Sequence, residues 1–126
     1  MVEIRREDFS VDEITGKMQD PKIGAIAIYL GTVREFPEGV GIEFEENDSA
    51  VRELEEIEKR AINRFAVKEV AIIHRIGFLG KSENILLIAV SAAHRGPAFD
   101  ACRRIIDEIK DLHKSWGREV SKQKSL

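Results

Sequence analysis

Apolar residues recur along the chain in three stretches of helical spacing and four of strand spacing. Helical spacing follows a capping box at residues 10–13 and occurs again over residues 48–65 and 97–113. Strand-like runs occupy residues 23–33, 40–45, 69–78 and 84–92. The resulting order is αββαββα, with the strands in consecutive pairs. This order predicts an α+β fold in which helices cover an antiparallel or mixed sheet.

The polar content of each strand predicts where it lies in a sheet. Residues 23–33 are almost all apolar, so we expect a central strand covered on both faces. In residues 40–45, apolar positions alternate with polar or small ones, which is typical of a strand with one solvent-exposed face. Residues 69–78 and 84–92 are joined by a turn that contains Gly80, and this arrangement predicts an antiparallel hairpin.

Composition limits the kind of protein. The 126 residues predict a single domain over residues 1–120, followed by a polar tail at 121–126. A net charge of −3 argues against a general nucleic-acid binder. No run approaches the roughly 18 to 20 apolar residues that span a bilayer, so we expect no membrane partner. The single cysteine excludes an internal disulfide and fits a cytoplasmic location.

The segment from Val90 to Pro97 holds the first candidate site. An apolar strand stops at His94 and Arg95, and Pro97 suits the first position of a helix, which makes Gly96 the predicted cap. Unpaired amides and the helix dipole would attract a phosphate or another anion there. The alternative is structural, with His94 capping a turn and Arg95 as a solvated surface charge.

Two further cations are candidates by position. Arg34 ends the apolar run 23–33, where a charge is also an ordinary structural feature. Lys110 lies at the border of the apolar stripe of the third helix. A partly buried lysine there would offer a base or nucleophile, whereas a snorkelling lysine would only cover the stripe with its stem. Cys102 is predicted to be a core residue, and His74 a core or turn residue instead of a ligand.

Sequence motifs of the common catalytic classes do not occur in the chain. There is no glycine-rich phosphate loop, no HExxH or CxxC pair and no GxSxG sequence. Pattern and spacing alone therefore predict an α+β domain with a candidate anion site.

Several short strings, in their order and spacing, resemble a known family. They are GAI at 24–26, GTVR at 31–34, IHRIG at 73–77, SAAHR at 91–95 followed by Phe99, and WGRE at 116–119. Together they look like the large, catalytic subunit of molybdopterin synthase, over nearly the full chain. The resemblance implies an α/β-hammerhead fold. It also implies a homodimer of large subunits within a heterotetramer, with a ubiquitin-like small subunit at each end.

The reaction that this resemblance implies is a step of molybdenum cofactor biosynthesis. Sulfur passes from a thiocarboxylate on the C-terminal glycine of the small subunit to cyclic pyranopterin monophosphate, which becomes the dithiolene of molybdopterin. The tail that carries the glycine threads into a pocket of the large subunit. The resemblance therefore implies a sulfurtransferase that requires no metal and no organic cofactor.

Site residues follow from the resemblance by position. Those that match substrate-binding residues are Arg34, His94, Arg95, Arg118 and Glu119. The first three would orient the phosphate of the precursor, and the neighbouring chain of the dimer can supply one of these groups. Lys110 matches the catalytic lysine beside the glycine tail, where it would assist proton transfer or stabilise the attacked thiocarboxylate. We expect these groups to form one pocket.

One position departs from the family pattern. Family members usually carry a second active-site lysine directly after the tryptophan, and this chain has Gly117 there. Lys114 and Lys122 are nearby lysines that could supply the charge, although neither matches the motif. The departure leaves an alternative, a non-catalytic relative that binds the tail of a ubiquitin-like partner without efficient chemistry.

Overall fold

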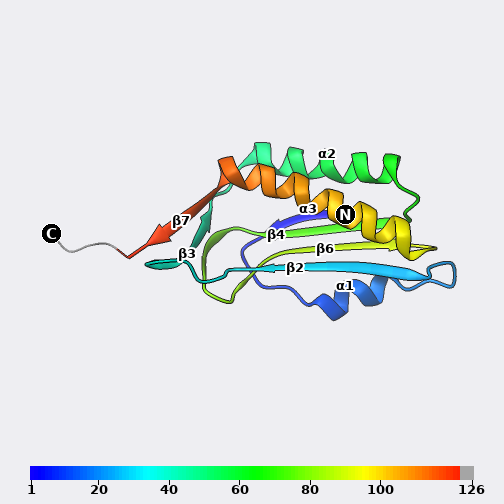
Figure 1. Ribbon diagram of the computed structural model, residues 1–126, viewed down its shortest axis with the longest axis horizontal. Helices are drawn as coiled ribbons and strands as arrows, with labels where there is room; N and C mark the ends of the chain where they lie inside the picture. The colour runs from blue at the N-terminus through cyan, green and yellow to red at the C-terminus, as the bar shows by residue number, and fades with distance from the viewer. Residues whose placement is uncertain (123–126) are drawn as a thin grey trace.

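A computed structural model describes residues 1–122 and shows an α+β architecture, as predicted (Figure 1). Its elements are β1 (Val2–Arg5), α1 (Val11–Met18), β2 (Ala25–Thr32), β3 (Gly39–Phe44), α2 (Asp48–Arg64), β4 (Glu69–Arg75), β5 (Gly77–Gly80), β6 (Asn84–Ala92), α3 (Arg95–Trp116) and β7 (Gly117–Ser121). The predicted order lacks β1, β5 and β7. Each has only four or five residues and is stabilised by pairing with another strand rather than by its own pattern.

The strands form two sheets. The larger has the order β1-β4-β6-β2, and the smaller has the order β5-β3-β7. β1 runs parallel to β4, and the other pairs are antiparallel, so the larger sheet is mixed. Helices α2 and α3 cover one face of the larger sheet and α1 the other, while β3 and β7 extend beyond the end of α3 (Figure 1). The smaller sheet therefore meets the C-terminal end of α3.

β4 and β6 lie at the centre of the larger sheet and pair antiparallel, as predicted. The predicted strand 69–78 is too long and the simple turn is wrong, because residues 77–80 form β5, which pairs with β3 in the smaller sheet. Successive residues point to opposite faces, and both faces are covered. Ile72 and Ile88 belong to the core that includes α2 and α3. Ile73 and Leu87 pack with Phe9 beside α1.

Local helix signals were predicted correctly. The Ser10 hydroxyl accepts the Glu13 amide at 3.2 Å, so the predicted capping residue does cap α1. Helix α2 begins at Asp48, as the apolar stripe predicts, and Asn47 caps it. Within residues 1–122, no helix is both long and apolar enough to cross a bilayer.

The start of α3 differs from the prediction. His94 is the N-cap and Arg95 the first helical residue, so Pro97 is the third residue and Gly96 the second. Pro97 is still in the first turn, where a backbone N–H would have no hydrogen-bond partner within the helix, so the missing N–H of proline costs nothing. The helix ends at Trp116, three residues after the predicted end at residue 113. β7 includes Ser121, which the sequence predicts to belong to the polar tail. Residues 123–126 of the predicted tail lie outside the described residues.

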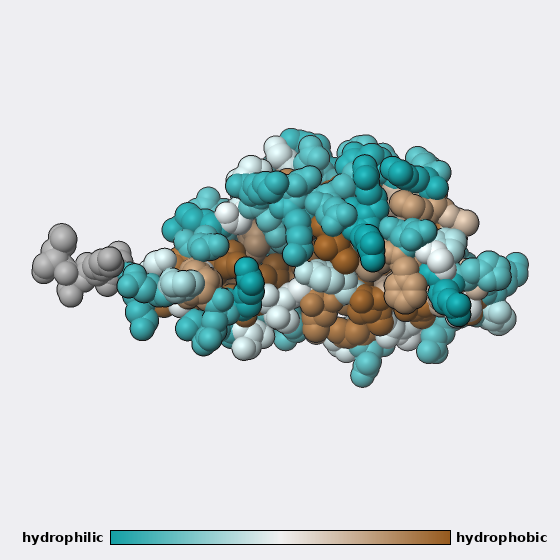
Figure 2. Space-filling model, in the orientation of Figure 1, coloured by the Kyte–Doolittle hydropathy of each residue, from teal (hydrophilic) through white to brown (hydrophobic). Residues whose placement is uncertain are grey.

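The predicted central position of residues 23–33 is wrong. β2 is an edge strand that pairs only with β6. One of its faces packs against α3, but on the other Ile28 is 46% exposed and Leu30 42%. Apolar side chains gather over β2 and beside α1 in Figure 2. A continuous apolar run does not distinguish a strand covered by its own chain from one with an open apolar face.

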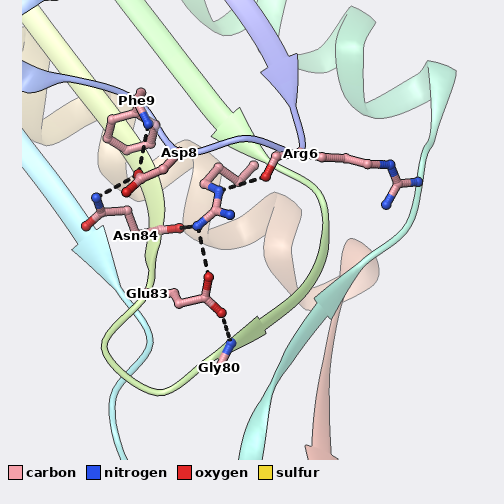
Figure 3. A network of polar contacts seen from close by, with 7 residues as sticks. Arg6, Asp8, Phe9, Gly80, Glu83 and Asn84 are labelled. Carbon is pink, nitrogen blue, oxygen red and sulfur yellow. Dashed lines mark hydrogen bonds and ion pairs between the residues drawn. The ribbon is translucent and has the colours of Figure 1, made fainter.

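A network of polar contacts fixes the end of β4. The Arg75 side chain is nearly buried and donates to the carbonyl oxygens of Arg6 at 3.0 Å and Asn84 at 3.1 Å, and to the Glu83 carboxylate at 3.4 Å. Asn84 donates in turn to Asp8 at 2.9 Å (Figure 3). The Arg75 backbone, which receives a hydrogen bond in the site described next, is thereby held in place.

Candidate functional site

A cavity of about 260 Å³ lies between β2, β6, the start of the smaller sheet and the C-terminal half of α3. Apolar side chains line part of it, Ile42 from β3 and Ile106 from α3 among them. Arg34, which follows β2, and Lys110 and His113 of α3 line the rest. The structure thus brings together Arg34 and Lys110, two of the predicted site residues that are far apart in sequence.

Arg34 and Lys110 are cations without an acidic partner. Both are exposed, and neither takes part in any ion pair among residues 1–122. Of the two alternatives for Lys110, the structure shows the exposed lysine and not the partly buried one, because its position on α3 faces an open cavity instead of packed core. Two unpaired cations beside apolar walls favour an anionic ligand.

A cluster of four rings, which we call the ring cluster, packs beside the cavity. Its members are Phe44 of β3, His74 of β4, and His113 and Trp116 of α3. The centroid of His74 lies 4.3 Å from that of Trp116 and 4.7 Å from that of Phe44. The Trp116 indole donates to the Glu45 carbonyl at 2.7 Å. The cluster joins the larger sheet, the smaller sheet and α3.

The two histidines of the ring cluster satisfy each other. His74 Nδ1 donates to the Arg75 carbonyl at 2.7 Å, so in the neutral ring Nε2 is an acceptor. His113 Nε2 lies 2.7 Å from it and is the donor. Burial, with a smaller effect of His113, lowers the pKa of His74 to about 3. Burial and then the charge of Lys110 lower the pKa of His113 to about 4. Both rings are neutral at neutral pH.

The sequence left His74 as a core or turn residue, and the structure shows it in the core. Sequence reasoning missed His113. The two histidines are 39 positions apart in sequence, so no local sequence pattern predicts their hydrogen bond. The one available signal was the three-residue spacing from Lys110 to His113, which puts both on one side of a helix.

His94 and Arg95 do not join the cavity within one chain. Both are exposed at the first turn of α3, whereas Lys110 lies near its other end. At 1.5 Å per residue, Arg95 and Lys110 are about 22 Å apart along the helix axis. The expectation of one pocket therefore fails for a single chain, because a straight helix separates its two halves.

Arg118 and Glu119 lie on opposite faces of β7. Arg118 stands opposite Glu43 in the register and forms an ion pair with it, directed away from the cavity. Glu119 stands opposite Ile42, which lines the cavity, and so shares that face. Of this predicted pair, only Glu119 is on the side of Lys110.

Gly117 is closely packed against the ring cluster. A Cβ atom at this position would lie 2.8 Å from Cε1 of Phe44. Phe44 is 2% exposed and is held between the other three rings, so it has little room to move. The space that a family lysine would need is therefore occupied in this chain.

Other reactive groups contribute less. Cys102 is buried in the core, as predicted, and burial raises the pKa of its thiol to about 11. No group of three or more metal-ligating side chains comes together among residues 1–122. A hollow of about 290 Å³ between α2 and α3 contains arginines, but Glu108 pairs with Arg60 and Arg104 there.

Comparisons with known proteins agree on one family. Residues 4–112 match the family model described as MoaE protein. The molybdopterin synthase catalytic subunit of Pyrococcus abyssi is 39% identical over 121 residues, which cover 91% of this chain and 80% of that protein. The human molybdopterin synthase catalytic subunit is 32% identical, over 99% of this chain and 69% of that protein. A solved molybdopterin synthase structure from Staphylococcus aureus aligns with a TM-score of 0.83 and 27% identity, over 96% of this chain and 91% of that one.

Acid should destabilise the fold through the two buried histidines. Unfolded histidines take up protons near pH 6.5, whereas in the folded chain the pKa values of His74 and His113 are about 3 and 4. The unfolded state therefore binds more protons below pH 6.5. We expect the free energy of unfolding to fall between pH 6.5 and 5, by up to about 1.4 kcal/mol per pH unit for each histidine. Urea unfolding at several pH values measures the slope.

Two variants test which histidines set this slope. His113→Gln keeps a donor for His74 but does not titrate, so the slope should decrease. His94→Gln alters an exposed histidine and should leave the slope unchanged. An unaltered slope in His113→Gln would contradict this account of the pair.

Gly117→Ala should destabilise the fold, because its methyl group would press on Phe44. We expect a loss of about 1–3 kcal/mol in the free energy of unfolding, measured with urea. The matched control is Gly16→Ala in α1, where a Cβ meets no atom within 4 Å and alanine should stabilise the helix by a few tenths of a kcal/mol or more. Equal stability of Gly117→Ala and the unaltered protein would show that the packing is not tight.

Proposed function

The chain belongs to the MoaE protein family, and from this membership we propose that it is the catalytic subunit of a molybdopterin synthase. It transfers sulfur from a thiocarboxylate on the C-terminal glycine of a small subunit to cyclic pyranopterin monophosphate, which becomes the molybdopterin dithiolene. The observation that carries the proposal is the cavity in which the unpaired cations Arg34 and Lys110 meet.

The chemistry of the cavity suits these reactants. A thiocarboxylate tail and a phosphorylated precursor are both anions, and each needs a cation that no carboxylate already occupies. Arg34 presents a planar guanidinium that can bind a phosphate through two hydrogen bonds. Lys110 supplies a single charge that can stabilise negative charge developing on the attacked thiocarboxylate. A bound tail or precursor would displace water from the apolar walls beside the two exposed cations and strengthen their effect.

A small subunit is the partner that this reaction requires. The relatives are named catalytic subunits, which supports a second kind of subunit in the assembly. We infer a ubiquitin-like small subunit whose extended C-terminal tail enters the cavity. A cytoplasmic location fits the buried, unpaired thiol of Cys102.

A second copy of the chain would complete the site. His94 and Arg95 are about 22 Å from Lys110 along α3, so they reach a cavity with Lys110 only if another chain presents them. The open edge of β2, with Ile28 and Leu30 exposed, is an apolar surface suited to such contact. We therefore infer a homodimer at the centre of a heterotetramer, with each site built from two chains.

The alternative function is that of a non-catalytic relative, and Gly117 is the observation that favours it. Reconstitution separates the two. The chain is mixed with a thiocarboxylated small subunit and cyclic pyranopterin monophosphate, and dithiolene formation is assayed. Product formation supports the synthase. Tight binding of the small subunit without product would establish the alternative.

Lys110→Ala should abolish most turnover in this assay, with a loss of about a hundredfold. The fold should be intact, because Lys110 is exposed and makes no ion pair among residues 1–122. Lys17→Ala, an exposed lysine of α1, is the control and should retain full activity. Normal turnover by Lys110→Ala would refute the role given to this lysine.

Mixing two inactive variants should restore activity if each site spans two chains. In a dimer of Lys110→Ala with His94→Ala, one site combines both changes and the other contains neither. Random exchange makes half of the dimers mixed, so we expect about a quarter of the unaltered activity. The measurement is turnover after the variants are co-refolded, against each variant alone. Absence of recovery would place both residues in the same chain's site or in no common site.

A further inference from the structure

We propose that His113, held by His74, is the proton acceptor of the cavity that contains Lys110. The inference deepens the proposed sulfur transfer and rests on it. It concerns a residue that the family resemblance did not select.

The hydrogen bonds decide which nitrogen of His113 can accept a proton. Its Nε2 is the donor to His74, whose own Nδ1 is bound to the Arg75 carbonyl. The lone pair of neutral His113 is therefore on Nδ1. Burial of Nδ1 without a hydrogen-bond partner can be excluded: among residues 1–122, the one side-chain nitrogen or oxygen that is both buried and without such a partner is Arg5 Nε. His113 Nδ1 makes no hydrogen bond within that part of the chain, so it is accessible, and His113 lines the cavity.

The groups around His113 set its protonation state. Lys110 lies one turn earlier on α3, Arg34 and Tyr29 line the same cavity from β2 and its end, and Glu119 is on the facing side of β7. Burial and Lys110 lower its pKa, so the ring is neutral before substrate binds. An anionic ligand beside Lys110 offsets that charge and makes the ring more basic. Protonation at Nδ1 leaves the bond to His74 in place and makes it charge-assisted.

Sulfur transfer needs such a group for the release of the small subunit. The thiocarboxylate sulfur first attacks a carbon of the precursor, where a C–S bond forms and a C–O bond breaks with its electron pair on oxygen. The acyl carbon and the precursor then share that sulfur as a thioester. Water then attacks the acyl carbon, a C–O bond forms, and the C–S bond breaks with its electron pair on sulfur. The tail leaves as a carboxylate. His113 Nδ1 takes the proton that the water loses as it attacks and passes it to solvent. The second proton of the water goes to solvent when the new carboxylic acid ionises.

The position of His113 also accounts for the departure at Gly117. Phe44 fills the space next to Gly117, and the same Phe44 ring packs on His113 with centroids 4.9 Å apart. His113 thus brings a titratable group to the cavity wall from the helix, where this chain has no lysine on the strand.

The experiment compares two neighbouring substitutions in the reconstituted assay. His113→Gln retains a donor for His74 but cannot take a proton, so turnover should fall about a hundredfold while KM for the precursor changes by less than about threefold. Lys114→Gln is the control, since Lys114 is exposed, pairs with Asp111 at 3.1 Å and does not line the cavity. It should turn over normally. Unchanged turnover in His113→Gln, or a loss only in Lys114→Gln, overturns the proposal.

A second measurement does not depend on catalysis. In ¹⁵N spectra of the histidine-labelled chain at pH 7, His113 should be protonated at Nε2 and bare at Nδ1, and His74 should show the reverse. The His113→Gln and His94→Gln spectra assign the signals. A proton on Nδ1 of His113 would overturn the proposal even if His113→Gln failed to fold. An inactive unaltered protein with the expected tautomers would instead refute the proposed function.

Discussion

The mutual hydrogen bond of His74 and His113 is the contact on which the site depends. Aromatic rings bury large areas, and the ring cluster uses that burial to hold α3 against both sheets. A buried imidazole is costly unless its nitrogens have partners. Each ring provides one for the other, and the Arg75 carbonyl provides the next. The cavity lies directly beside this cluster, so the hydrogen bonds that allow the cluster to be buried also fix the orientation of one cavity wall.

Charge is distributed so that the cavity is basic although the whole chain is acidic. The net charge is −3, yet Arg34 and Lys110 have no carboxylate partner among residues 1–122. Glu43 pairs with Arg118 on the opposite face of the smaller sheet, while Glu119 shares the cavity face without pairing with either cation. Neutral histidines next to the cations preserve the local positive potential. The arrangement would attract anions to this cavity without making the protein a general polyanion binder.

Sequence patterns predicted the elements whose signals are local, and failed where the partner is distant. The Ser10 cap and the stripe of α2 depend on neighbouring residues, and β4 pairs with β6 across a short separation in sequence. Short strands such as β1 and β7 are defined by pairing with β4 and β3, far away in sequence. Arg34 and Lys110 were candidates by their positions, and the family resemblance added their roles. His113 was missed because its hydrogen-bond partner is 39 positions away.

Positions 113 and 117 are linked through Phe44. Gly117 stands opposite Phe44 in the register of β3 and β7, and only a hydrogen at Gly117 allows the Phe44 ring its position. In this position the Phe44 ring packs against both His74 and His113. A lysine at 117 would displace Phe44 and loosen the histidine pair. A chain of this fold can therefore carry a strand lysine or the tightly packed histidine pair at this wall, and the geometry opposes having both. Packing around Phe44 thus gives a structural reason for glycine at this position, beside the loss of a catalytic group that the non-catalytic alternative invokes.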